Sequence, residues 1–311
     1  QTIAEPPATQ PPATQTPVTQ TPATQTPAVQ TPMTQTPAVP VQRVAPDAST
    51  QSRPAVVDEE VIVEADRRYD ALTWMQNASE YRQQTAQAYR YALFQLVTGL
   101  RDRQWSADEA QSVANDFADK PPAIILDVDE TVLDNSAFNA RNVINGRLYQ
   151  TDDWNAWCQE GNADAVTGAI EFIEQAAGLG AKVFFVTNRS DEVKAATIEN
   201  LKKFGVEADA DNVLTKNRDA GRSGDKISRR AMVAENYRIV LLIGDNLSDF
   251  CDGMDVPNSN IRNQRANEKR ELFGARWIML PNPVYGSWQR ALPRGVDALH
   301  PKVSRQDVDE P

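Results

Sequence analysis

Short runs of consecutive apolar residues, separated by helical patterns, constrain the fold of this chain more than any other feature. Helical spacing of apolar residues recurs at about 164–178, 191–204 and 226–236. Continuous apolar strands that alternate with helices are typical of a parallel sheet covered on both faces. In such α/β folds the ligand lies beyond the carboxyl ends of the strands. The expected strands are residues 123–128, 182–187, 239–244 and 276–280, with 212–215 as a shorter fifth.

The first 56 residues have a different composition. Twelve of the twenty prolines fall in residues 1–54, and proline recurs every five residues from 12 to 37. We expect a disordered Pro/Thr/Gln-rich linker over 1–56, because it has too few large apolar side chains to offset the entropy cost of folding. Two interpretations stay open: a tail without a role, or a spacer between a removed or lipidated N-terminus and a folded domain. The spacer suits an exported protein in the periplasm, outer membrane or cell surface.

The remaining chain suffices for one α/β domain with a cap. We predict a folded domain over 57–300 and a tail over 301–311. Within the domain the core is expected at about 120–132 and 160–295. The cap is expected from about 60–110, which is mostly helical, and from 133–160.

Charge and composition exclude several classes of protein. The formal net charge of −11 opposes binding to a nucleic-acid polymer. The single histidine, His300, stands near the C-terminus, so hydrolytic chemistry must depend on carboxylates, hydroxyls, lysine or a metal. No apolar run approaches the ~18 residues of a membrane span. For Cys158 and Cys251, buried free thiols are favoured over a disulfide.

Carboxylates follow two of the predicted strands. Asp127 and Asp129 are two residues apart, so they face the same side of an extended chain. Asp245 and Asp249 follow the third strand and share a face if that loop turns helical. Four carboxylates at one sheet edge repel each other, and a divalent cation relieves this. Oxygen ligands in modest number favour Mg²⁺, so all four aspartates are candidate metal ligands.

The same edge carries candidates for phosphate chemistry. Thr187 and Asn188 end the second strand, and Lys226 opens the helix before the third, so these three are candidate phosphate-binding residues. Without a well-placed histidine, the nucleophile is best assigned to Asp127, which can form an aspartyl-phosphate. Asp129 can protonate the leaving oxygen and then deprotonate water. Thr131 and Asn246 are candidates for supporting these groups.

With these motifs in view, the chain resembles the phosphohydrolases of the haloacid dehalogenase (HAD) superfamily. More narrowly, it is similar to the class C bacterial acid phosphatases, a four-aspartate group that includes exported lipoprotein 5′-nucleotidases. The residues that carry the resemblance cover about 70–295. They are 74–81, ILDVDETVLDNS at 125–136, FFVTNR at 184–189, Lys226 with Arg229, GDNLSDF at 244–250 and PNPVYGSW at 281–288.

The resemblance implies a Rossmann-like parallel sheet of the HAD type with a helical cap. It implies Asp127 as the nucleophile and Asp129 as the acid and base. It also implies Mg²⁺ held by Asp127, the carbonyl of Asp129 and Asp245, with Asp249 orienting water in the coordination shell. Thr187 and Lys226 are implied to hold the phosphate. The family is mostly exported and includes lipid-anchored members, which agrees with the predicted linker and with a possible lipid anchor.

Aromatic residues of the cap are candidates for substrate selection. Tyr149 and Tyr285 are positioned to flank a planar group, although both could equally belong to the core of the cap. Base–aromatic stacking tolerates every base. The expected function is therefore a Mg²⁺-dependent acid phosphatase that acts on small phosphomonoesters, nucleoside monophosphates above all. A phosphotransferase that uses the same intermediate, and a non-enzymatic surface protein, are the alternatives. The sequence leaves the oligomeric state and the natural substrate open.

Overall fold

The computed structural model describes residues 59–217 and 224–293, with side chains from Arg68 onward. The predicted linker and tail, and His300 with them, lie outside the described residues. Because the described part begins at helix α1 (Glu59–Asn77), everything that follows concerns the predicted phosphatase domain.

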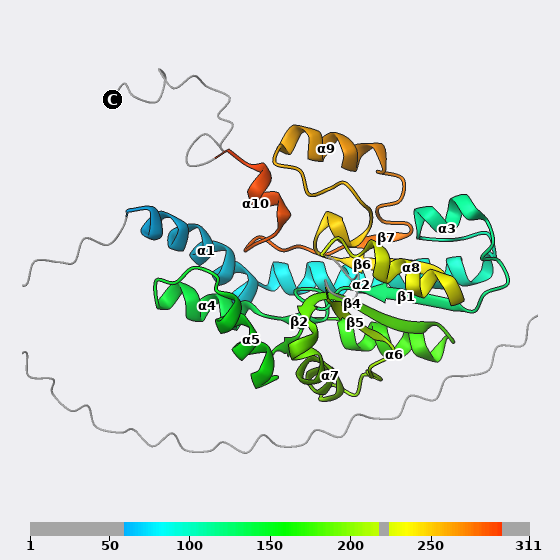
Figure 1. The fold of residues 1–311 in the computed structure, drawn as a ribbon, viewed down its shortest axis with the longest axis horizontal. Helices are drawn as coiled ribbons and strands as arrows, with labels where there is room; N and C mark the ends of the chain where they lie inside the picture. Colours follow the sequence, from blue (N-terminus) through cyan, green and yellow to red (C-terminus); the bar gives the residue numbers. More distant parts are fainter. Residues whose placement is uncertain (1–58, 218–223, 294–311) are drawn as a thin grey trace, which may run out of the picture. The chain divides into compact units, whose positions relative to one another are not determined.

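A five-stranded parallel sheet forms the centre of the domain, in the order β5-β4-β1-β6-β7 (Figure 1). All five predicted strands are confirmed, with bounds within a few residues of those expected. They are β1 (Pro122–Leu126), β4 (Lys182–Ser190), β5 (Val213–Lys216), β6 (Arg238–Gly244) and β7 (Trp277–Met279). The α/β prediction with a parallel sheet is therefore confirmed.

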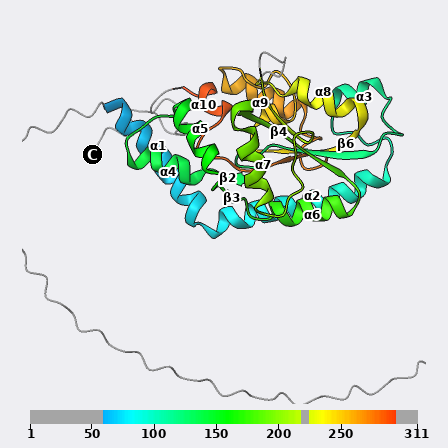
Figure 2. The same cartoon turned by 60° about the horizontal axis from the view of Figure 1, so that its bottom comes forward.

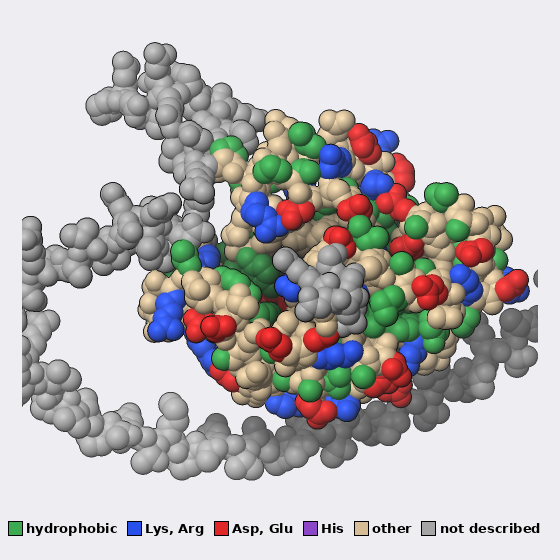
Figure 3. All heavy atoms as spheres, viewed as in Figure 1, with side chains coloured by type: hydrophobic (Ala, Val, Ile, Leu, Met, Phe, Trp, Pro, Cys, Tyr) green, Lys and Arg blue, Asp and Glu red, His purple; other side chains and the backbone are tan. Residues whose placement is uncertain are grey.

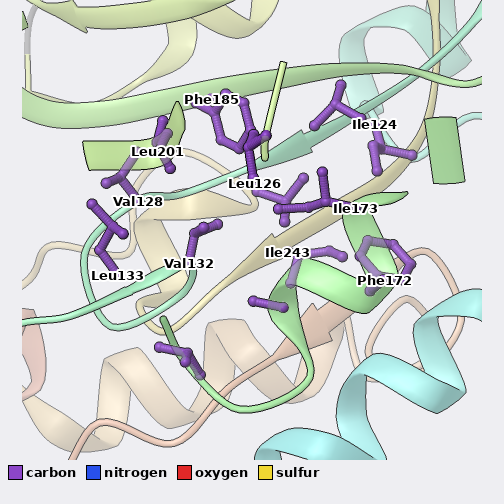
Figure 4. Packing of buried hydrophobic residues seen from close by; sticks show 14 of the residues in the cluster. Ile124, Leu126, Val128, Val132, Leu133, Phe172, Ile173, Phe185, Leu201 and Ile243 are labelled. Atoms are coloured by element: carbon purple, nitrogen blue, oxygen red, sulfur yellow. The ribbon is translucent and has the colours of Figure 1, made fainter. Parts of the chain in front are cut away.

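The sheet is apolar because helices cover both of its faces. Ile124 and Leu126 of β1 pack in a cluster that includes Phe172 of helix α6 (Ala169–Gly178). Their neighbour Ile125 points to the opposite face and packs in a cluster with Val233 of helix α8 (Ile227–Asn236). Figure 2 shows α6 and helix α2 (Ser79–Arg101) on one side of the sheet and α8 on the other. Figure 4 shows side chains of the first cluster, with Ile124, Leu126 and Phe172 among those labelled.

Helix α2 approaches the sheet at a glycine. A Cβ on Gly99 would lie 2.6 Å from the side chain of Val240, so only glycine permits this approach. Val240 is the extra residue of a β-bulge in β6, and its carbonyl accepts a hydrogen bond from Trp105 Nε1 at 2.9 Å. The buried Arg238 then donates to the carbonyls of Gly99, Asp102 and Trp105, each at 2.9 Å. This arginine therefore secures the end of α2 against the amino end of β6.

The cap region lies between two short antiparallel strands, β2 (Leu133–Asp134) and β3 (Asp164–Ala165). Helices α4 (Ser136–Ile144) and α5 (Thr151–Glu160) occupy the segment between them. The stretch 60–110, which the sequence assigned to the cap, contains α1 and α2, and these two helices pack against different parts of the domain. Helix α1 contacts α4, whereas α2 contacts α6, β6 and β7 and so covers the sheet.

The remaining helices are short or lie at the periphery. Among the described residues no helix is both long and apolar enough to cross a membrane. The short or peripheral helices are α3 (Glu109–Ala114), the 3₁₀ turns η1 (Asp191–Val193) and η2 (Leu247–Asp249), α7 (Lys194–Lys202), α9 (Ser259–Glu268) and α10 (Ser287–Ala291).

Both cysteines are buried and unbonded, which confirms the prediction of free thiols. Burial, as the largest cause, raises the pKa of Cys158 to about 12 and that of Cys251 to about 11, from 9.0. Since the thiolate is the reactive form, we expect both thiols of the native protein to react with iodoacetamide at pH 8 at least roughly a hundredfold more slowly than a free thiol. Mass spectrometry of labelled protein measures this, with protein unfolded in guanidinium as the control. Rapid labelling of the folded protein would contradict the described burial.

Candidate active site

The loops after β1, β4, β6 and β7 converge at the carboxyl edge of the sheet (Figure 1). The ladder between β1 and β6 continues past the strand end, where the amide of Asp127 donates to the carbonyl of Ile243 at 2.9 Å. On the other side of β6, the amide of Leu280 donates to the carbonyl of Gly244 at 2.8 Å. These bonds place Asp127 and Asp245 at neighbouring strand ends, as the sequence predicted.

Three carboxylates meet at this edge. One oxygen from each of Asp127, Asp245 and Asp249 lies within 4.8 Å of the others. Gly244 makes the arrangement possible, because a Cβ there would lie 2.3 Å from Asp249 Oδ2. The same Oδ2 accepts from the amide of Asn246 at 2.9 Å, which completes a capping box on η2. Three hard oxygen donors at this spacing fit a divalent cation of the Mg²⁺ type.

Lys226 provides the positive charge closest to this cluster. It precedes α8 with φ = 64°, in the left-handed region that is uncommon for a lysine. Its buried Nζ lies 2.7 Å from Asp127 Oδ1 and 2.7 Å from Asp249 Oδ1. Burial lowers the pKa of Lys226, but the two carboxylates outweigh burial and raise that pKa overall. The lysine therefore stays charged between its two partners.

One lysine does not balance three carboxylates. Burial, followed by repulsion from neighbouring carboxylates, raises the pKa of Asp127 to about 7, even though Lys226 lowers it. The same two causes raise the pKa of Asp245 well above its ordinary value. Hydrogen bonds from Thr131 Oγ1 at 3.2 Å and Asn282 Nδ2 at 2.9 Å hold the carboxylate of Asp245 in place. The edge is thus built to receive further positive charge.

The carboxylate of Asp129 lies outside the group of three and has partners of its own. Its Oδ1 accepts from Arg189, with Nε at 2.9 Å and Nη2 at 2.8 Å, and from Asn135 Nδ2 at 3.0 Å. Its Oδ2 accepts from Thr187 Oγ1 at 3.3 Å. The side chain of Asp129 therefore faces residues of β4 and the cap rather than the carboxylate cluster.

Sequence reasoning assigned no role to Arg189, Asn135 or Trp157. Arg189 is almost fully buried, and its Nη2 donates to Asn135 Oδ1 at 3.1 Å. Trp157 Nε1, from α5, donates to the same oxygen at 2.8 Å. Charged residues are seldom buried unless paired, so an arginine directly after a buried strand was the available signal.

Thr187 and Asn188, two of the three predicted phosphate-binding residues, lie near the end of β4, but their surroundings differ. Thr187 is buried, and its Oγ1 lies beside Asp129. Asn188 is exposed and joins two other elements, because its Oδ1 accepts from Arg229 at 2.7 Å and its Nδ2 donates to the carbonyl of Gly224 at 2.9 Å. Asn188 therefore tethers the start of the segment that carries Lys226.

Tyr149 and Tyr285 belong to two separate aromatic groups. Tyr149 is 57% exposed and lies edge-on to Phe138, with ring centroids 6.4 Å apart. Tyr285 packs near helix α1, and its hydroxyl donates to the carboxylate of the buried Glu130. Glu130 is a residue that sequence reasoning missed. Figure 3 shows acidic and basic side chains interspersed over the face of the molecule that is seen in Figure 1.

Comparison with known proteins identifies relatives of the whole domain. The family model for the HAD superfamily, subfamily IIIB (acid phosphatase), matches residues 42–288. The structure of the class C acid phosphatase from Bacillus anthracis superposes with a TM-score of 0.63 and 32% identity, over 79% of this chain and 94% of that chain. A second structure of that phosphatase, with tungstate bound, gives the same values.

Curated plant proteins match a shorter segment. Acid phosphatase 1 of Solanum lycopersicum is 31% identical over 164 residues, which is 52% of this chain and 57% of that protein. The Stem 28 kDa glycoprotein of Glycine max is 25% identical over 165 residues, 58% of its length. The chain thus spans little more than half the length of these curated relatives.

The raised pKa values predict how pH and a divalent cation affect stability. Between the ordinary Asp value of 3.8 and about 7, folded Asp127 binds a proton that the unfolded chain has lost. The free energy of unfolding of the metal-free protein should therefore fall as the pH rises through this range. A divalent cation competes with these protons, so its stabilising effect should be larger at pH 7 than at pH 5.

The substitution Asp245→Asn separates the two effects. We expect it to stabilise the metal-free protein at pH 7, because one repelling carboxylate is removed, and to abolish the gain from Mg²⁺. Thermal unfolding with EDTA and with Mg²⁺ measures both, and Asp211→Asn, an exposed aspartate outside the cluster, is the matched control. An equal response to Mg²⁺ in both variants would show that the cluster holds no cation.

Proposed function

Because the chain belongs to subfamily IIIB of the HAD superfamily, the acid phosphatase subfamily, we propose that it is a Mg²⁺-dependent acid phosphatase that hydrolyses phosphomonoesters. The observation that carries the proposal is the position of Asp127. Its carboxylate ends β1 between the ammonium of Lys226 and the acidic cluster. A nucleophile placed beside a lysine and a proposed cation site suits attack on an anionic phosphoryl group.

The donor set supports Mg²⁺ as the cofactor. We propose that the carboxylates of Asp127 and Asp245 and the main-chain carbonyl of Asp129 hold it, with Asp249 orienting water in its shell. When bound, the cation offsets the charge of the phosphoryl oxygens. Asp249 is held on both oxygens, by Lys226 at 2.7 Å and by the amide of Asn246 at 2.9 Å, which fixes the direction of its carboxylate.

We propose a reaction in two steps. A carboxylate oxygen of Asp127 attacks phosphorus, the bond to the ester oxygen breaks, and Asp129 gives that oxygen a proton. Asp129 then takes a proton from water, the water oxygen attacks phosphorus, and the bond to Asp127 breaks to release phosphate. Lys226 and Thr187 hold the phosphoryl oxygens during both steps, and Asn188 supports this group by tethering the chain at Gly224.

We propose nucleoside monophosphates as the preferred substrates, with the base between Tyr149 and Tyr285. The half-exposed ring of Tyr149 and the hydroxyl anchor of Tyr285 on Glu130 support this proposal. An aromatic surface fixed in this way stacks on any base. Export is the location that we propose, on the basis of the proline-rich segment and the glycoprotein names of two Glycine max relatives.

Substitution of the two catalytic aspartates tests the mechanism. We expect Asp127→Asn to abolish phosphate release and Asp129→Asn to lower kcat by about 10²–10⁴-fold, the usual contribution of a general acid and base. Phosphate release from p-nitrophenyl phosphate, sugar phosphates and nucleotides, with Mg²⁺ or EDTA, measures this. Asp211→Asn should retain full activity. Substantial turnover by Asp127→Asn would contradict the covalent route. As a phosphate analogue, tungstate should inhibit the wild-type protein.

Removal of the aromatic rings tests the substrate proposal. We expect Tyr149→Ala and Tyr285→Ala to lower kcat/KM for nucleoside monophosphates about 5- to 150-fold, the equivalent of ~1–3 kcal/mol of stacking. Activity on glycerol phosphate, which has no ring, should change far less. Tyr149→Phe, which keeps the ring, is the matched control. An equal loss on both substrates would mean that the tyrosines support the fold instead of binding the base.

A further inference from the structure

Arg230 is a buried cation that has no role in the reaction described above. It lies one turn beyond Lys226 in α8 and is 4% exposed. Its Nη1 donates to the main-chain carbonyl of Asp249 at 3.1 Å and to that of Ser248 at 3.3 Å. Both carbonyls belong to η2, the turn that presents Asp249 to the acidic cluster.

Helix α8 and the residue before it therefore hold Asp249 at two points. Lys226 contacts its carboxylate at 2.7 Å, and Arg230 contacts its carbonyl. A main-chain bond fixes where the residue lies, and the side-chain ion pair fixes where its carboxylate points. Metal ligands depend on such outer contacts, which orient the ligand before the cation arrives.

Arg230 is in turn held by a neighbouring helix. Its Nε lies 3.8 Å from Oδ2 of the buried Asp108. Asp108 caps α3 by accepting a hydrogen bond from the amide of Gln111 at 2.9 Å. Figure 1 and Figure 2 both show α3 beside α8. A buried chain of polar contacts thus runs from the cap of α3 through Arg230 to the carboxylate cluster.

We propose that Arg230 is a positioning residue for the cation site, which it serves by fixing η2 so that Asp249 meets Asp127 and Asp245. This inference rests on the proposed function, because it assumes that the cluster binds Mg²⁺. Without the guanidinium, two carbonyls lose their donor and the turn loses one of its two attachments to α8. The affinity of the cluster for Mg²⁺ should therefore fall.

Calorimetric titration of the metal-free protein with Mg²⁺ tests the proposal without any reference to activity. We expect Arg230→Ala to weaken the Kd by about tenfold or more, in the range typical for outer contacts of metal ligands. Arg238→Ala is the matched control, because Arg238 is equally buried and also donates to main-chain carbonyls, but at the amino end of β6. It should lose thermal stability and keep the wild-type Kd.

A cavity beside Arg230 allows a second test by chemical rescue. It has a volume of about 420 Å³, and α3, α8 and residues 250–252 line it, with Arg230 and Asp108 among them. Ethylguanidinium can therefore reach the space that Arg230→Ala vacates. We expect it to restore the Mg²⁺ affinity of this variant and to leave that of Arg238→Ala unchanged. Arg230→Lys, which keeps the charge and one donor, should give an intermediate Kd and replaces the alanine variant if that variant fails to fold.

Three outcomes would overturn the proposal. An unchanged Kd in Arg230→Ala, or an equal weakening in Arg238→Ala, would refute it and leave the proposed function intact. A wild-type protein that binds no Mg²⁺ would refute the proposed metal site, and the role of Arg230 with it.

Discussion

The repulsion between carboxylates at the edge of the sheet is the constraint on which the rest of the site depends. Parallel strands deliver Asp127 and Asp245 to the same edge, and the lack of a side chain at Gly244 lets Asp249 pack against them. In a buried site such charges raise one another's pKa values unless a cation is present. The ammonium of Lys226 offsets part of this negative charge, although the lysine must adopt a left-handed backbone conformation to do so. A bound divalent cation would offset the remaining negative charge, which would account for three carboxylates at one largely buried edge.

A second consequence of this constraint is the separation of the fourth aspartate. Asp129 is only two residues from Asp127, yet its carboxylate contacts Arg189 and Asn135 instead of the cluster. The site therefore has two pairs of opposite charge, Lys226 with the cluster and Arg189 with Asp129. This division keeps Asp129, the proposed proton-transferring group, apart from the carboxylates proposed to bind a cation. The contacts of Asp129 also connect it to α5. Its partner Asn135 accepts hydrogen bonds on Oδ1 both from Arg189 and from Trp157 of α5.

The sequence predicted the sheet well because its strands are apolar on both faces, a pattern that helices in this chain do not share. It also predicted which residues reach the carboxyl edge, since that follows from strand ends alone. It could not separate α1 from α2, because both have amphipathic helical spacing and only tertiary contacts show that one meets α4 and the other the sheet. Nor could it predict the partners of Asp129. The bonds from Arg189 and Asn135 join residues 60 and 6 positions away, and no local pattern encodes such a choice.

In the proposed mechanism, a single buried acid joins substrate choice to catalysis. Glu130 stands between Asp129 and Thr131 in the loop after β1, and its carboxylate accepts the hydroxyl of Tyr285, which follows β7. The amide of Asn135 donates to the same carboxylate at 2.8 Å. The ring that is proposed to stack on a base is therefore anchored to the loop that carries Asp127, the proposed nucleophile. Tyr149 has no such link, because it lies between α4 and α5 against Phe138. One side of the proposed substrate site is thus fixed by the loop after β1, whereas the other belongs to the cap. Under this proposal, variation in the cap would alter specificity without moving the aspartates.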